Sequence, residues 1–147
     1  MFYNNGESKS RNEVEWMSAL TLEQFQQQVS ELLLRHRSLL DVMTKYGQAG
    51  ASVNRAVSKA VTECGCIEVN ARKQDYPDEL DLEQVKIKLN HHTSGRLCEN
   101  CKDVLRTELG KSLFYMSALS NLLDIKLEDV IEQESKKCST LGIFNLT

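Results

Sequence analysis

The chain is poor in proline and in aromatic residues. Its 147 residues include one proline, Pro77, and only 6% of them are aromatic. Proline interrupts helices because it lacks a backbone N–H and clashes with the preceding turn, whereas aromatic residues are enriched in strands. Both scarcities favour helices, and we expect a nearly all-α protein.

The chain also lacks a strong net charge and a long apolar run. Its formal net charge is −3 and its basic residues are scattered, so nothing in its electrostatics predicts a nucleic-acid partner. No apolar segment approaches the roughly 20 residues that span a bilayer. Residues 1–16 carry no apolar signal core. We therefore expect a cytoplasmic protein without a membrane partner.

The composition is that of an ordinary globular chain. Hydrophobic residues make up 41% of the sequence and charged residues 27%. The length fits one domain that can bury a core of its own. We assign residues 1–12 to a loose polar N-terminal tail and residues 13–147 to a single helical domain.

Apolar residues recur at helical spacing in four long segments and one short segment. We expect long helices from Thr21 to about residues 47–50, and over about 52–73, 98–123 and 127–138, with a short one over 81–90. Residues 75–81, 91–95 and 124–126 are the expected connections. Short connections favour antiparallel neighbours, so the sequence predicts a four- to five-helix bundle. Broad apolar stripes and an apolar C-terminal tail further predict a dimer, formed through the 52–73 and 98–123 helices.

Two carboxylates lie on helices that we expect to be neighbours. Glu63 belongs to the 52–73 helix, and Glu108 lies inside the apolar stripe of the 98–123 helix. If these helices pack antiparallel, both side chains could face one gap. Mg²⁺ prefers oxygen ligands and often binds a few carboxylates together with substrate phosphates. The alternative is that both are ordinary solvated acids.

Two runs resemble a known family. Residues 108–137, ELGKSLFYMSALSNLLDIKLEDVIEQESKK, resemble the C-terminal half of the MazG-type nucleoside triphosphate pyrophosphohydrolases, which carry a Glu-Leu-Gly-Asp helix and a Leu-Gly-Ile-x-Leu-Glu-Glu turn. Residues 60–69, AVTECGCIEV, resemble that family's Glu-Glu-x-x-Glu helix. The resemblance extends over about residues 21–138 at the level of helix order. It implies a MazG-like bundle, assembled as a homodimer or homotetramer, that cleaves a nucleoside triphosphate to the monophosphate and pyrophosphate.

The resemblance also implies a magnesium site, although this chain departs from the family pattern there. Glu63 and Glu108 match two of the family's four metal-binding acids, and they are the implied catalytic residues. Cys66 and Lys111 stand where the other two acids are expected. Lys111 could hold a substrate phosphate as a point charge, or it could pair with Glu108. We therefore expect a protein that either hydrolyses nucleotides or only binds them, with weakened Mg²⁺ binding.

The five cysteines predict a second kind of chemistry. In an unexported chain they should be mostly reduced. Thiolates and imidazoles bind zinc tetrahedrally, and the candidate ligands are Cys98, Cys101, His91 and His92, with Cys66 as an addition from the facing helix. Inside a helix, Cys64 and Cys66 would point about 200° apart, so both reach one ion only if the helix is interrupted.

Three roles for Cys98 and Cys101 remain open at this stage. The pair could serve a non-catalytic helical module that binds metal or interacts with another protein. It could act in redox chemistry, because a thiolate at a helix N-terminus is stabilised there. It could also be inert, with the histidines in a solvated loop.

Overall fold

The computed structural model describes residues 20–33, 38–74 and 89–141. Its elements are α1 (Leu22–Leu32), α2 (Leu39–Lys59), a π-helical turn η3 (Ala60–Cys64), β1 (Ile67–Val69), β2 (Thr93–Gly95), α4 (Glu99–Leu122) and α5 (Leu127–Leu141). This part of the chain is mostly helical, as the sequence predicts. The small two-stranded sheet was not expected.

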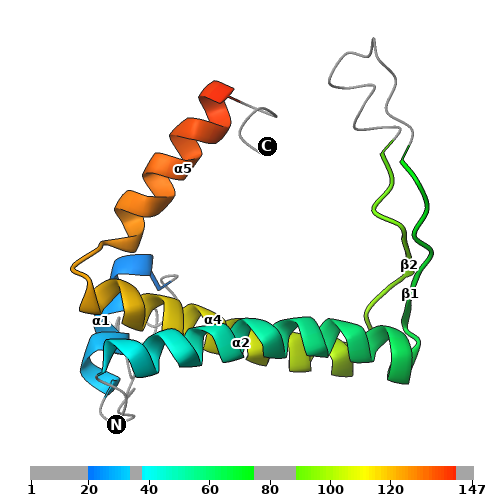
Figure 1. Cartoon of the computed structure of the whole chain (residues 1–147), viewed down its shortest axis with the longest axis horizontal. Coiled ribbons are helices and arrows are strands. Elements are labelled where there is room, and N and C mark those ends of the chain that lie inside the picture. The colour runs from blue at the N-terminus through cyan, green and yellow to red at the C-terminus, as the bar shows by residue number, and fades with distance from the viewer. Residues whose placement is uncertain (1–19, 34–37, 75–88, 142–147) are drawn as a thin grey trace, which may run out of the picture.

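An antiparallel pair of helices, α2 and α4, forms the long axis of the molecule (Figure 1). Val42 near the start of α2 shares a hydrophobic cluster with Ala118 near the end of α4. At the opposite end, Cys64 after α2 contacts Cys98 before α4. Figure 1 shows α1 and α5 at one end of this pair and the β1–β2 ribbon at the other.

The hydrophobic core lies at the α1 end of the helix pair. It consists of Val29, Leu33, Val42 and Ala118, with Phe25, Phe114 and Leu119 packed against it. The amide of Gln26 fastens this end by donating to the Ile125 carbonyl over 2.7 Å and accepting the backbone N–H of Leu127 over 3.0 Å. Between Val42 and Ala118, the buried hydrophobic residues of the described chain are Ala49 and Ala60. The far half of the pair therefore has little apolar packing of its own.

The predicted boundaries of the first two helices were wrong. The predicted first helix stops at Leu32, and α2 begins at Leu39 and continues through Gly47 and Gly50, where a break was expected. A glycine costs a helix only about 1 kcal/mol relative to alanine, so packing against α4 decides the outcome. The predicted second helix ends at Cys64, and residues 67–69 form a strand instead.

The later helices agree with the sequence. α4 and α5 match the 98–123 and 127–138 predictions closely, and Asp124, with a φ of 55°, makes the expected tight break between them. The expected 91–95 loop contains strand β2. Most of the predicted 81–90 helix, the 1–12 tail and the end of the C-terminal tail lie outside the described residues. Within the described ranges, no helix has both the length and the apolar character of a bilayer span.

Candidate metal centre

The end of α2 brings two cysteines to the same side of the chain. The π-helical turn Ala60–Cys64 widens the last turn, and Gly65 follows with a left-handed φ of 71°. Glycine adopts this conformation without the steric cost of a Cβ, so it commonly ends helices. The chain then changes direction, and Cys66 leads directly into β1. The helix is thus interrupted between Cys64 and Cys66, which was the condition for both to reach one ion.

The β1–β2 pairing carries the second pair of cysteines to the first. The strands are antiparallel, with Ile67 opposite Gly95, and the Arg96 N–H donates to the Cys66 carbonyl over 3.1 Å. Gly95 has a φ of 82°, and a Cβ at this position would lie 2.6 Å from the Cys66 carbonyl oxygen. Only glycine permits this close approach of the backbones. The pairing sets the start of α4, and therefore Cys98, beside the end of α2.

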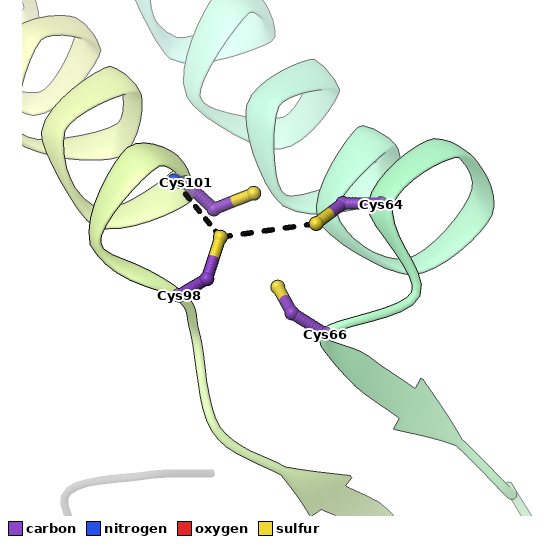
Figure 2. Close-up of side chains that lie close together, drawn as sticks. All are labelled: Cys64, Cys66, Cys98 and Cys101. Carbon is purple, nitrogen blue, oxygen red and sulfur yellow. Dashed lines mark hydrogen bonds between the residues drawn. The ribbon is translucent and has the colours of Figure 1, made fainter.

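Four thiols converge at this point, as Figure 2 shows. The sulfur atoms of Cys64, Cys66, Cys98 and Cys101 all lie within 4.8 Å of one another. We call this set the four-thiol cluster. The Cys64 and Cys98 sulfurs are 3.8 Å apart, and they come from segments separated by 34 residues. Cys64 is exposed, and the other three are half-buried.

Hydrogen bonds inside the four-thiol cluster give its thiols different pKa values. Cys98 is the N-cap of α4, and its sulfur accepts the Cys101 backbone N–H over 3.5 Å. That bond and the Cys101 thiol lower the pKa of Cys98 to about 7. Donation to Cys98 and partial desolvation raise the pKa of Cys101 to about 12. For Cys64, contact with Cys101 lowers the pKa, but contacts with Cys66 and Cys98 outweigh it and the pKa is raised. A cation that binds all four sulfurs must therefore displace protons.

The donor set and its spacing suit a tetrahedral metal ion. In a tetrahedron with metal–sulfur bonds of about 2.3 Å, the sulfurs lie about 3.8 Å apart. The Cys64–Cys98 separation of 3.8 Å already has this value, and a small contraction would bring the others to it. Thiolates select soft and borderline cations such as zinc. The four-thiol cluster can therefore hold a metal ion.

The structure brings together part of the predicted ligand set. Cys98, Cys101 and the added Cys66 lie close together as expected, whereas Cys64 completes the cluster and neither histidine belongs to it. The His92 Nδ1 accepts the Arg72 N–H over 3.2 Å. The His91 Nδ1 accepts the Thr93 N–H over 3.2 Å. Both imidazoles instead hold the backbone that extends from the β1–β2 pairing.

The predicted carboxylate pair is not assembled into a site. Glu63 is exposed and pairs with Lys59 over 3.0 Å, and Glu108 pairs with Lys111 over 2.7 Å. Glu108 shares a pocket with Ser52 of α2, and Ser52 precedes Glu63 by 11 residues, about 16 Å along a helix. Among the described residues, neither carboxylate belongs to a group of three mutually close ligands. The described residues therefore give the Mg²⁺ prediction no support.

Fold and site together define a class: a mostly helical protein whose antiparallel helix pair ends in a cluster of four cysteines. Comparison with protein-family models, with curated proteins and with solved structures finds no match to the chain. Membership of the MazG-type family therefore stays a prediction.

Proposed function

We propose that this protein is a non-catalytic zinc-binding module, in which the four-thiol cluster holds one Zn²⁺. The observation that carries the proposal is the convergence of four sulfurs, within 4.8 Å, from two separate segments of the chain. Cys64 and Cys66 flank the end of η3, whereas Cys98 is the N-cap of α4 and Cys101 lies in its first turn. Such pairs of closely spaced cysteines are typical of structural zinc sites.

A structural role is favoured over a catalytic one. Catalytic zinc keeps a coordination position open for water or substrate, whereas four cysteines fill all four positions. The metal would also act where packing is weakest. The far half of the α2–α4 pair buries only small side chains, and each strand of the sheet has three residues. A two-stranded hairpin is marginal by itself, so the zinc would stabilise this end.

Zinc content gives the first test. Reduced protein, purified without chelator, should contain about one zinc per chain by elemental analysis, and Cys64→Ser or Cys98→Ser should lose most of it. Cys138→Ser is the matched control, because Cys138 lies on α5, outside the four-thiol cluster. A zinc content near zero, together with no uptake in a titration of the reduced protein, would overturn the proposal. Equal zinc content in the wild type and in all three variants would also overturn the proposal.

The proposed assembly is a homodimer formed through the outer faces of α2 and α4. The described chain exposes sixteen large hydrophobic residues and buries seven hydrophobic ones. Nine of the exposed residues lie on the helix pair itself, among them Leu40, Met43, Leu109 and Leu113. A stable interface buries about 800 Å² on each partner, which two long helix faces can supply. Light scattering at micromolar concentration should give twice the chain mass, and a monomer would contradict it.

A second candidate function keeps the resemblance to the MazG-type enzymes, namely nucleotide binding with or without hydrolysis. The supporting observation is a shallow pocket of about 180 Å³ between α2 and α4, lined by Lys45, Gln48, Ala49, Ser52, Glu108, Lys111 and Tyr115. Lysine ammonium groups attract phosphate. The pocket is smaller than the roughly 300 Å³ at the lower end of ligand sites, so it suits a phosphate group better than a whole nucleotide.

A nucleotide panel tests this second candidate. Canonical and modified nucleoside triphosphates are incubated with the protein and Mg²⁺ or Mn²⁺, and pyrophosphate is measured. Activity that disappears in Glu108→Gln, or nucleotide binding that weakens in Lys111→Ala, would support it. The absence of both turnover and binding for every nucleotide tested would overturn this candidate.

A further inference from the structure

We propose that the four-thiol cluster is also a redox-sensitive site, in which a peroxide joins Cys64 to Cys98 as a disulfide and releases the zinc. This inference depends on the proposed zinc-binding function and adds a mode of regulation to it. Its basis is the arrangement of the two sulfurs. They already touch, at 3.8 Å, across the gap between two segments of the chain.

The Cys64–Cys98 pair is well placed for bond formation. A disulfide needs the sulfurs at about 2.05 Å, so they must approach by less than 2 Å. Cys64 precedes Gly65, and apart from Gly65 and its two chain neighbours no atom lies within 4 Å of the place where a Gly65 Cβ would be, so the chain has room to shift there. Cys98 is the N-cap of α4, outside the regular helix. Neither sulfur is locked in tight packing.

Solvent access separates this cluster from a buried structural zinc site. Cys64 is exposed, and Cys66, Cys98 and Cys101 are half-buried. Oxidation of a thiolate requires contact with the oxidant, so shielded cysteines are inert and exposed ones are reactive. Here a molecule as small as hydrogen peroxide can reach the sulfurs from the Cys64 side.

The reaction is a two-electron oxidation with hydrogen peroxide as the oxidant. The Cys98 thiolate attacks the peroxide, the O–O bond breaks, and Cys98 becomes a sulfenic acid while the second oxygen takes up a proton and leaves as water. The Cys64 thiolate then attacks the Cys98 sulfur. The S–S bond forms, the S–O bond breaks, and hydroxide takes up a proton to leave as a second water. Two thiolates have lost two electrons and one peroxide has gained them.

The consequence follows from the loss of two ligands. Cys66 and Cys101 alone leave zinc with two of its four sulfur ligands, so it is released to solvent. The new bond meanwhile joins the end of α2 to the start of α4. The helix pair therefore stays closed when the metal leaves. Peroxide thus replaces the zinc-mediated connection between the two segments with a disulfide, and free zinc is the released product.

The test is a peroxide titration of reduced, zinc-loaded protein. Free zinc is followed with a colorimetric chelator, and the disulfide is mapped by mass spectrometry of a non-reducing digest. We expect about one zinc released per peroxide consumed, a Cys64–Cys98 crosslink, and recovery of zinc binding after dithiothreitol and added zinc. Cys138→Ser should behave as the wild type. Mapping the oxidised wild-type chain avoids reliance on cluster variants that bind zinc poorly.

The outcomes separate this inference from the proposed function. Reduced protein that takes up no zinc overturns both. Protein that binds zinc and keeps it in tenfold excess peroxide overturns the redox inference alone. Zinc release accompanied only by sulfinic acid, or only by disulfides within the 64–66 and 98–101 pairs, also overturns it.

Discussion

Gly95→Ala should uncouple the two halves of the metal centre. A Cβ at this position would lie 2.6 Å from the Cys66 carbonyl oxygen, far inside van der Waals contact. The obstacle is a backbone atom, so no side-chain rotation relieves it and β2 must move away from β1. That movement separates Cys98 and Cys101 from Cys64 and Cys66. The φ of 82° adds a second penalty, because left-handed backbone costs a residue with a Cβ about 1–2 kcal/mol.

Three glycines provide a graded series for measuring this effect. Gly65→Ala carries the backbone penalty alone, since its φ is 71° and a Cβ there meets nothing within 4 Å. Gly47→Ala carries neither penalty, because it lies in the middle of α2 with open space around it. Each 1.4 kcal/mol is about a factor of ten in affinity. We expect zinc affinity unchanged in Gly47→Ala, about tenfold weaker in Gly65→Ala, and weaker by at least about a hundredfold in Gly95→Ala.

Competition against a chromophoric chelator of known zinc affinity measures all four proteins under the same conditions. Thermal unfolding of each protein without metal checks that the core at the α1 end is intact. Zinc affinity in Gly95→Ala equal to that of the wild type would contradict the prediction, because the strand pairing would then not position the ligands. A loss of similar size in Gly47→Ala would refute it too.

Three further predictions concern the two ends of the molecule. Removing metal with a chelator should speed amide exchange in β1, β2 and the adjoining ends of α2 and α4, while exchange near Val29 and Val42 stays slow; uniform acceleration would contradict this. In metal-free protein at pH 7.5, substoichiometric iodoacetamide should label Cys98 before Cys101. The reason is that pH 7.5 lies above the Cys98 pKa of about 7 and far below the Cys101 pKa of about 12. Mass spectrometry that finds Cys101 labelled first would contradict this prediction. Val42→Ala should lower the free energy of unfolding by roughly 1–3 kcal/mol without changing zinc content, as checked by denaturant melts and elemental analysis.

The helices that local signals define could be read from the sequence. Thr21 and Gln24 have the sequence spacing of a capping box, and each side chain is bonded to the backbone of the other residue. The 98–123 segment is a helix capped by Cys98, and its apolar periodicity was sufficient to find it. The error at Gly47 and Gly50 came from treating glycine as a break, where contact between α2 and α4 sustains the helix. The three-residue strands carried no periodic signal at all.

Three of the four clustered cysteines were among the predicted ligands, and finding the fourth, Cys64, depended on one residue. Reading residues 52–73 as an uninterrupted helix sets Cys64 and Cys66 on opposite sides and makes the histidines the better ligands. Gly65 was the available signal, because a glycine between two cysteines can end a helix in the left-handed conformation and reverse the chain. For Lys111, the sequence had left two roles open. Of the two roles open to it, the structure shows the ion pair with Glu108, as a cation one turn from an acid allows.

The distribution of buried side chains explains why a metal would be useful at the ribbon end of this chain. The apolar cluster around Val29 and Val42 fixes α1 against the start of α2 and the end of α4. Farther along the helix pair, Ala49 and Ala60 are too small to supply comparable burial free energy. A zinc–thiolate centre stabilises such an end without apolar volume, because its bonds replace the missing packing. With zinc bound as proposed, the folding of the β1–β2 end would depend on zinc supply and on reduced thiols, while the apolar cluster would stay folded without them.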